Sequence, residues 1–325
     1  MPGLSEKDAD SKSEALKLLE SMRLELQKNP ENHNLRYDYA DELNENGFAK
    51  EAIKQYNYLI SFFPKNKMLY YSLGVALEKN NELENSVDAY KKSVMCDPGF
   101  ADGHYNLAYA YDRLGKFLPA IQEYETAIKL DPEDSNAHFN LGCVLSKMND
   151  SDRAIEHLRT SIEINPNDEY AHFYLAYEMQ KRGDMDAAIS GYRAVLEVNP
   201  GYSWAHFNLG FIYLFQGDKE RAYEEYLATY NLNPRDDDAF KKLVVVGLEC
   251  GYCDATLEIL EDRVVNDPKN VFNQFYMGEV YFLMKEYEDA LYHYSLAIEL
   301  PEITSLGIDM KSFKTRLEKL RKFVQ

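Results

Sequence analysis

The amino-acid sequence indicates an all-α solenoid, in which one pair of helices is copied along the chain and stacked. Prolines recur every 34 residues at eight nodes of the 325-residue chain: Pro30, Pro64, Pro98, Pro132, Pro166, Pro200, Pro234 and Pro268. A fixed period of this length is typical of a repeat architecture. A chain made almost entirely of repeats has little room for a catalytic domain, so the pattern favours a binding surface over an enzyme.

Two helices account for the pattern inside each repeat. We number each repeat so that the proline near its end is position 32, which makes residue 33 position 1 of repeat 1. Small residues recur at positions 8 and 20, and large residues at positions 7, 11 and 24. This spacing predicts a first helix (helix A) and a second helix (helix B) with facing apolar sides. The small residues let the helices approach, and the large residues fill the adjacent space.

A turn near position 15 separates the two helices. Residues that tolerate left-handed backbone occupy this position in seven repeats: Gly47, Asn81, Gly115, Asn149, Gly183, Gly217 and Gly251. The recurring proline then ends helix B, because it cannot donate a backbone hydrogen bond. Repeat 7 departs most from the pattern, with Val244, Gly247 and Thr256 at positions 8, 11 and 20. We expect looser packing there.

These residues resemble the tetratricopeptide repeat signature, which is almost complete between Ala101 and Pro132. The resemblance covers eight consecutive repeats, residues 33–301. It implies a right-handed superhelical α-solenoid in which helix A of each repeat lines the concave side. It also implies a non-enzymatic scaffold or adaptor that binds a protein or peptide partner in that groove.

The segments outside the repeats are predicted to close the two ends of the array. We expect a disordered N-terminus over residues 1–10, an N-terminal capping helix within 11–32, and a C-terminal capping helix within 302–325. The last helix has an apolar stripe from Met310 to Phe323 and a basic polar face. A helix that binds a membrane surface or a partner is the alternative for this segment.

The charge and composition exclude several classes of function. Lys and Arg total 36 against 55 Asp and Glu, a net charge of −19, so a nucleic-acid partner is not expected. No apolar run approaches the ~20 residues of a membrane span. The N-terminal residues lack the apolar core of a secretory signal, and four cysteines are too few for a disulfide scaffold. These features predict a cytoplasmic protein.

The candidate binding residues lie on the face of helix A that packing does not use. Position 5 is aromatic in seven repeats, position 6 is Asn in three, position 9 adds aromatic rings, and position 13 is basic in repeats 2 to 5. The candidate peptide-binding residues are Tyr105, Asn106, Tyr109, Arg113, Phe139, Asn140, Lys147, Phe173, Tyr174, Tyr177, Lys181, Phe207, Asn208 and Phe211.

An Asn side chain can pair with both polar groups of one peptide unit, and rigid aromatic anchors suit protein interfaces. A similar asparagine ladder belongs to the superhelical array of O-GlcNAc transferases. The alternative is that Asn and Tyr only repeat the family consensus and that the basic residues are solvated. The carboxylate clamp of heat-shock co-chaperones is not matched, since only Lys241 has a suitable residue type at position 5.

Two further patterns resemble chemical sites. Cys250 and Cys253 form a C-x-x-C motif like that of thiol-redox proteins, but Gly251 between them is the expected turn residue. Four histidines share position 4 and lie one repeat apart, ~10 Å or more, too far to share one ion. We therefore expect no enzymatic activity, no cofactor and no metal. Besides a thiol-redox protein, the remaining alternative is a structural component that self-assembles into a homo-oligomer or a larger complex.

Overall fold

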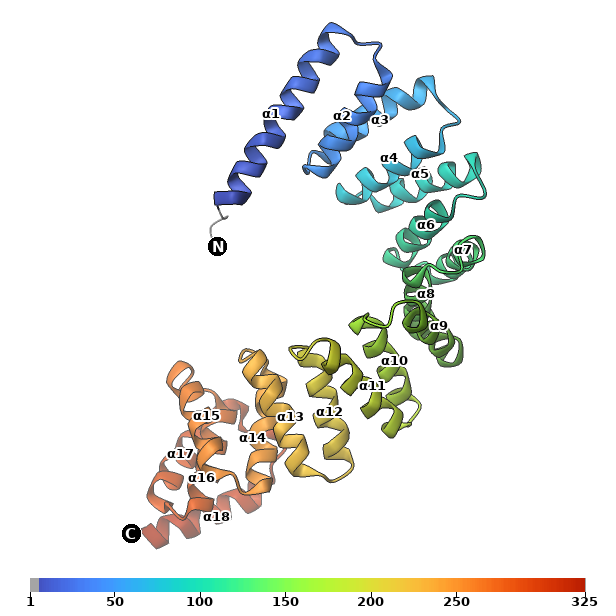
Figure 1. Cartoon of the computed structure of the whole chain (residues 1–325). Coiled ribbons are helices and arrows are strands. Elements are labelled where there is room, and N and C mark those ends of the chain that lie inside the picture. The colour runs from blue at the N-terminus through green and yellow to red at the C-terminus, as the bar shows by residue number, and fades with distance from the viewer. Residues whose placement is uncertain (1–5, 325) are drawn as a thin grey trace. The chain divides into compact units, whose positions relative to one another are not determined.

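The computed structural model describes residues 6–324, with side chains from residue 13 onward. Over this range the chain forms helices joined by short turns and contains no strand (Figure 1). The prediction of an all-α solenoid of paired helices is confirmed. The chain divides into two compact units at the turn of repeat 5, with unit 1 ending at Gly183 and unit 2 beginning at Asp184. Each unit is described by itself.

Unit 1 contains a long first helix followed by helix pairs that stack on one another (Figure 1). Its helices are α1 (Glu6–Lys28), α2 (His33–Glu45), α3 (Ala49–Phe62), α4 (Lys67–Lys79), α5 (Leu83–Cys96), α6 (Ala101–Arg113), α7 (Phe117–Leu130), α8 (Ser135–Lys147), α9 (Ser151–Ile164) and α10 (Glu169–Lys181). Even-numbered helices are helix A of repeats 1 to 5.

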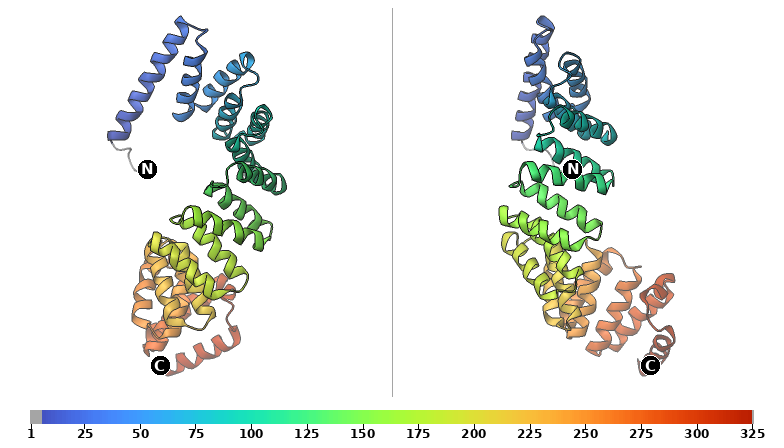
Figure 2. Two further views of the ribbon diagram at one scale, coloured as in Figure 1. Left: turned by 45° about the vertical axis from the view of Figure 1, so that its right-hand side comes forward. Right: turned by 90° about the vertical axis from the view of Figure 1, so that its right-hand side faces the viewer.

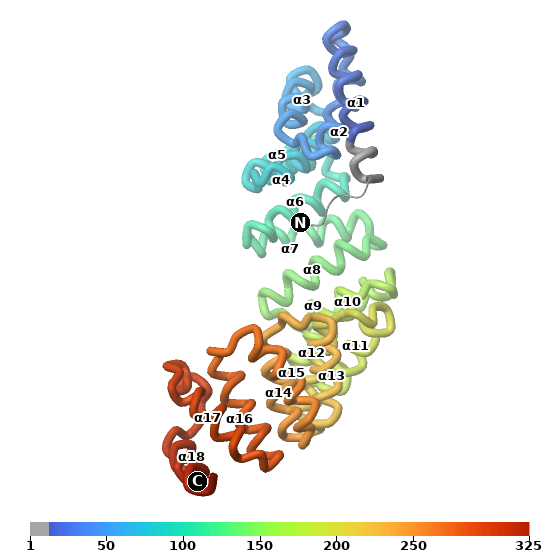
Figure 3. Tube along the Cα trace, turned by 90° about the vertical axis from the view of Figure 1, so that its left-hand side faces the viewer, coloured from blue at the N-terminus to red at the C-terminus, as the bar shows by residue number. Residues whose placement is uncertain are grey.

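Unit 2 continues the same alternation, and short turns join its successive helices (Figure 3). Its helices are α11 (Met185–Val198), α12 (Ser203–Phe215), α13 (Lys219–Leu232), α14 (Asp237–Cys250), α15 (Cys253–Asn266), α16 (Val271–Met284), α17 (Tyr287–Glu299), the 3-10 helix η1 (Pro301–Leu306) and α18 (Met310–Val324). Helices α12, α14 and α16 are helix A of repeats 6 to 8.

Asp and Asn side chains start most of the A helices. Asn66 Oδ1 accepts hydrogen bonds from the backbone of Met68 and Leu69, and Asp134, Asp168 and Asp236 cap their helices in the same way. These residues lie two positions after the recurring proline. Because a carboxylate or amide oxygen satisfies backbone N–H groups that have no partner in the first turn, the caps fix where each repeat begins.

The seven predicted turn residues all have a left-handed backbone, with φ between 60° and 84°. The turn of the eighth repeat has the same geometry, since Lys285 at position 15 has a φ of 66°. Sequence inspection did not single out this residue. A side chain with a Cβ is strained in this region of backbone space. The geometry of the turn is therefore imposed by the helix pair, even where the residue is unfavourable.

The small residues at position 8 allow the two helices of a repeat to touch. A Cβ built on Gly278 would lie 2.4 Å from the ring of Tyr294, and one on Gly74 would lie 2.5 Å from the ring of Tyr90. The tyrosine at position 24 therefore occupies the space that a larger residue at position 8 would need. In repeat 7, Val244 and Leu260 replace this pair, and both are buried.

Repeat 7 has a less extensive contact between its two helices than repeats 2, 3, 4, 6 and 8. Its Gly247 lies against two neighbours, since an added Cβ would be 2.5 Å from Thr256 Oγ1 and 3.0 Å from the Tyr223 ring. The glycine thus permits a close approach in addition to lowering helix propensity. The predicted looser packing agrees with the reduced contact between α14 and α15.

The terminal helices cover the exposed apolar ends of the first and last repeats. Helix α1 begins at Glu6, earlier than expected, and packs on α2 with Leu19 and Leu26 buried. Residues 1–5, half of the segment predicted to be disordered, lie outside the described residues. At the other end α18, dark red in Figure 2, packs against α17 and buries Phe313, Leu317 and Leu320.

Candidate functional site

The candidate binding residues lie on the A helices, and all of them are at least partly exposed. Helices α6, α8 and α10 carry those of repeats 3 to 5 in unit 1, and α12 carries Phe207, Asn208 and Phe211 in unit 2. The candidate residues fall into two groups according to the contacts that their side chains make within the protein. Most polar members are engaged with the neighbouring repeat, while the aromatic residues at position 9 present their rings to solvent.

The aromatic residues at position 5 are packing residues as well as surface residues. The Tyr105 ring lies 5.8 Å from that of Tyr124 in helix B of the same repeat, and Phe207 lies 5.6 Å from Tyr226. Burial raises the pKa of Tyr105 to about 12. Phe139 instead contacts Tyr174 of the next repeat, at 5.6 Å between ring centroids. These rings therefore support the helix pairs or the contact between repeats, and they are only partly exposed to a partner.

The asparagines at position 6 bind within the array. Asn106 Nδ2 donates to the Tyr71 hydroxyl at 2.8 Å, and Asn140 Nδ2 donates to the Tyr105 hydroxyl at the same distance. Each bond joins residues 35 positions apart and so connects helix A of one repeat to helix A of the next. Asn208 Nδ2 instead donates to the Trp204 carbonyl of its own helix at 2.7 Å.

The basic residues at position 13 make similar links between repeats. Lys147 Nζ lies 2.8 and 2.9 Å from the two carboxylate oxygens of Asp112, and Arg113 Nη1 lies 3.7 Å from Glu78 Oε1. Lys181 Nζ donates to the Ser146 carbonyl of the preceding repeat at 3.5 Å and lies 2.9 Å from Glu178 Oε1, a buried carboxylate of its own helix. The cations thus neutralise acidic groups of the array itself, which weakens their attraction for an acidic partner.

Sequence inspection missed these links between neighbouring A helices. The signal was present, because an acid at position 12 precedes by 35 residues a cation at position 13 of the next repeat, as in Glu78 and Arg113. The asparagine amide oxygens can still accept a hydrogen bond, since a carbonyl has two lone pairs. Asn106 Nδ2 also donates to the Asp102 carbonyl at 3.1 Å, so a clamp that uses both polar groups of Asn106 would first have to break one of its two bonds. Asn140 Nδ2 has a second N–H beside the one that it donates to Tyr105, so Asn140 can keep that bond.

Aromatic side chains on α12 form the most exposed apolar surface among the candidates. The exposed fraction is 59% for Trp204, 43% for Phe211 and 71% for Phe215. They occupy positions 2, 9 and 13, and the spacing of seven and four residues places them along one side of the helix. The predicted set of site residues included Phe211 and omitted Phe215, whose position carries a basic residue in repeats 2 to 5. We call Trp204, Phe211 and Phe215 the aromatic stripe.

In unit 1, two tyrosines at position 9 add smaller exposed rings. Tyr109 and Tyr177 are 38% and 42% exposed. The cation one turn further along the helix lies over each ring, with Arg113 at 6.0 Å from the Tyr109 centroid and Lys181 at 5.7 Å from the Tyr177 centroid. These cation–π contacts occupy one face of each tyrosine and leave less free aromatic surface than the stripe on α12.

The histidines at position 4 are hydrogen-bonding residues inside single repeats. His104 and His206 each bind a glutamate of helix B at 2.6 Å through Nδ1, and the proline carbonyl before the repeat at 3.2 Å through Nε2. His138 instead meets His157, at 3.1 Å between the Nδ1 atoms. In residues 13–324, no group of three or more His, Cys, Asp or Glu side chains is placed to hold a metal ion.

The C-x-x-C motif spans the turn of repeat 7. Cys250 is the last residue of α14 and Cys253 is the first residue of α15, and the two thiols are not joined in a disulfide. Burial, with Glu220 adding to it at Cys250, raises the pKa of both thiols. A reactive thiol needs a lowered pKa, so this environment does not favour redox chemistry.

Across residues 6–324, none of the helices has both the length and the apolar character that a membrane crossing requires.

Family models described as tetratricopeptide repeat match residues 26–99, 101–134, 123–156 and 180–244. No curated protein matches the chain.

Solved structures share the fold. YrrB, described as a TPR protein with an unusual peptide-binding site, is 26% identical at a TM-score of 0.51, over 57% of this chain and 95% of YrrB. PilF of Pseudomonas aeruginosa has a TM-score of 0.56 at 17% identity, over 67% of this chain and 97% of PilF. PilW, described as a type IV pilus biogenesis factor, has a TM-score of 0.52 at 14% identity, over 64% of this chain and 96% of PilW.

Proposed function

Since the chain belongs to the tetratricopeptide repeat family, we propose that it is a protein-interaction scaffold that binds a partner segment on the exposed face of its A helices. The repeats and the repeat proteins with similar structures support an interaction scaffold in general. Peptide binding is proposed by analogy with YrrB, which is described by its peptide-binding site. No catalytic role is proposed, because a solenoid fold does not by itself supply one.

The observation that carries the proposal is the aromatic stripe on α12. Three large rings on one helix face are exposed, while the position-5 ring beside them, Phe207, is packed against helix B. Exposed apolar rings gathered on one face of a helix mark interaction sites more often than scattered single apolar residues do. Trp and Phe side chains also lose little conformational entropy on binding, because each has only two side-chain torsions.

The proposed contacts use the side-chain groups of the A helices that are exposed or can still accept a hydrogen bond. We propose that apolar side chains of the partner pack between Trp204, Phe211 and Phe215, and that the Asn208 amide oxygen accepts a hydrogen bond from the partner backbone. In unit 1 the exposed rings of Tyr109 and Tyr177 provide weaker contacts, because cations already cover one face of each. The asparagines thus assist binding, and the aromatic residues supply most of its free energy.

The test compares partner capture by two matched variants. The double variant Phe211→Ala, Phe215→Ala removes two exposed rings, and Val265→Ala removes an apolar side chain of α15 that is 82% exposed. The immobilised chain and each variant are incubated with extract of the source cells, and the retained proteins are quantified by mass spectrometry.

Proteins retained by the parent and by Val265→Ala should be depleted roughly tenfold or more on the double variant, since hot-spot aromatics each contribute more than ~1 kcal/mol. Circular dichroism should be unchanged, because both rings are exposed. Equal retention by all three proteins would refute the assignment of the stripe.

A further inference from the structure

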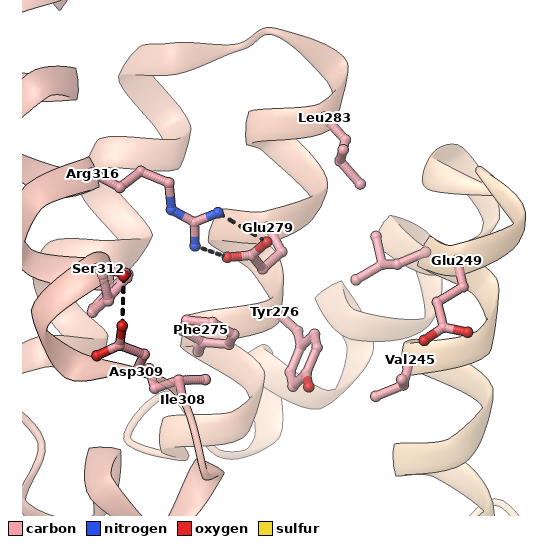
Figure 4. A pocket seen from close by; sticks show the side chains of 12 residues that line it. Val245, Glu249, Phe275, Tyr276, Glu279, Leu283, Ile308, Asp309, Ser312 and Arg316 are labelled. Carbon is pink, nitrogen blue, oxygen red and sulfur yellow. Dashed lines mark hydrogen bonds and ion pairs between the residues drawn. The ribbon is translucent and has the colours of Figure 1, made fainter.

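A pocket of about 520 Å³ lies at the C-terminal end of unit 2, between α14, α16 and the capping helix α18 (Figure 4). Its volume falls within the ~300–1,000 Å³ typical of ligand sites. Residues from positions 9, 12 and 13 of repeat 7 and positions 5, 6, 9 and 13 of repeat 8 line one side. Ile308, Asp309 and the first turns of α18 line the other. The capping helix therefore completes a pocket that the repeats alone would leave open.

The walls of the pocket are mainly apolar. Val245 and Leu248 of α14, Leu283 of α16 and Ile308 contribute apolar side chains, and the ring of Tyr276 lies between Ile308 and Val245 (Figure 4). Phe275 is buried and its ring lies 5.2 Å from that of Tyr276. The walls can therefore accept an extended apolar stem.

The charged residues of the pocket are three carboxylates and one guanidinium, namely Glu249, Glu279, Asp309 and Arg316. Arg316 binds both carboxylate oxygens of Glu279, as the dashed lines in Figure 4 show. Its guanidinium also lies 5.1 Å from the Tyr294 ring centroid and 5.3 Å from that of Phe282. The Arg316 guanidinium is therefore already engaged in contacts within the protein. The other charged side chains that line the pocket are negative. This distribution repels an anion and attracts a cation.

The other two carboxylates keep part of their hydrogen-bonding capacity. Asp309 accepts from the Lys311 backbone at 3.0 Å and from the Ser312 hydroxyl at 2.5 Å, which caps α18. Glu249 Oε2 lies 3.1 Å from Lys219 Nζ, and both side chains of this pair are more than two-fifths exposed. A carboxylate has about four acceptor sites, so each group can accept a further hydrogen bond. Asp309 and Glu249 lie on opposite sides of the pocket, with Phe275 and Tyr276 between them, so a single ligand cation can meet only one of the two (Figure 4).

We propose that this terminal pocket binds an arginine or lysine side chain of a partner protein. The stem of that side chain would lie along Leu283, Tyr276 and Val245, and its cation would meet Glu249, which lies on the same side of the pocket as Val245. Long cationic side chains combine an apolar stem and a charged tip in this way. The inference rests on the proposed function, because it treats the occupant as part of a partner chain, and it names the chemistry of one anchoring residue.

The experiment uses three peptides as probes: acetyl-Phe-Arg amide, its neutral isostere acetyl-Phe-citrulline amide, and acetyl-Phe-Glu amide. Each is titrated into the full chain, and methyl NMR signals of Ile308 and Leu283 report occupancy of the pocket. The arginine peptide should shift these signals with saturation and bind on the order of fivefold or more tightly than the citrulline peptide, as expected for one favourable ion pair. The glutamate peptide should bind most weakly.

Two variants separate charge recognition from folding. Glu249→Gln should abolish the preference for arginine over citrulline, and it leaves the cap of α18 at Asp309 in place. Glu224→Gln, at an exposed acid on α13, should leave the preference intact. Equal affinity for the three peptides, or shifts that spare Ile308 and Leu283, would overturn the proposal. That result would leave the capture test of the aromatic stripe unaffected, so the two failures are distinguishable.

Discussion

Individual polar side chains connect the two helices of a repeat at a fixed separation of 19 residues. The residue at position 4 of helix A binds the residue at position 23 of helix B in several repeats: Arg36 with Gln55, His104 with Glu123, His138 with His157, His206 with Glu225, and Gln274 with His293. The same contact is therefore made by different chemical pairs, and its dependence on pH should differ from repeat to repeat.

The histidine pair of repeat 4 should make the protein sensitive to mild acid. Burial lowers the pKa of both His138 and His157. The unfolded chain then takes up protons near the ordinary histidine pKa of about 6.5, while the folded pair stays neutral to lower pH. Stability contributed by this pair is present above pH ~6.5 and is lost as the pH falls below it.

Replacing His157→Glu should reverse this dependence. The variant recreates the arrangement of repeat 6, where the hydrogen bond that His206 donates to the Glu225 carboxylate raises the pKa of His206. A raised histidine pKa stabilises the folded state at low pH and loses its effect as the pH rises through that pKa. Urea denaturation at pH 7.5 and pH 5.5 measures the change. The variant should gain stability relative to the parent at pH 5.5, and a parallel loss in both proteins would contradict the assignment.

The left-handed backbone at Lys285 can be tested by substitution. Its left-handed backbone costs a residue with a Cβ about 1–2 kcal/mol, and glycine avoids this cost. We therefore expect Lys285→Gly to stabilise the chain by about 1 kcal/mol, measured as the free energy of unfolding. The control Lys285→Ala removes the same charge and keeps a Cβ, so it should show no comparable gain. Equal effects of the two changes would show that charge, and not backbone strain, governs this turn.

Neighbouring A helices in unit 1 are joined by side-chain bonds between residues 35 positions apart. Asn106 with Tyr71 and Asn140 with Tyr105 use amide donors, and Lys147 with Asp112 is an ion pair. In an array where each repeat contacts only its neighbours, the free energy of these contacts between repeats makes unfolding cooperative. These A-helix residues of unit 1 therefore contribute to the stability of the array as well as to its surface.

A double-mutant cycle on Asn106 and Tyr71 tests this role. Each single change, Asn106→Ala or Tyr71→Phe, should lower the free energy of unfolding by about 1 kcal/mol, because it leaves a polar partner without its bond. The double variant should lose less than the sum of the single losses, which gives a coupling energy above ~0.5 kcal/mol. Additive losses would mean that the hydrogen bond does not connect the two helices.

The helix pairs were predictable because their determinants are local and repeated. Small residues such as Gly278, the turn residues at position 15 and the prolines each act within one repeat, so their period is visible in the chain. The links between repeats were less visible, because Asn106 and Arg113 find partners that only stacking brings near. The terminal pocket was not predictable, since α18 closes it through a contact with residues more than 30 positions earlier, such as Arg316 with Glu279.

Across the whole chain, acidic residues outnumber basic ones, yet the described ion pairs use several of the basic residues of the A helices internally. The resulting surface favours a partner that is neutral or basic and that carries large apolar side chains. The aromatic stripe and the terminal pocket, both in unit 2, meet these two requirements. We therefore propose that the main contact with the partner lies on the A helices of unit 2.

Site-specific photo-crosslinking provides the decisive measurement. Benzoylphenylalanine replaces Phe211 on the stripe in one protein and Val265 on α15 in another, and both are irradiated in extract of the source cells. We expect a discrete crosslinked species from residue 211 and none of the same mass from residue 265. A partner that crosslinks at residue 265 and not at residue 211 would place the interaction on the B helices and contradict the proposed site.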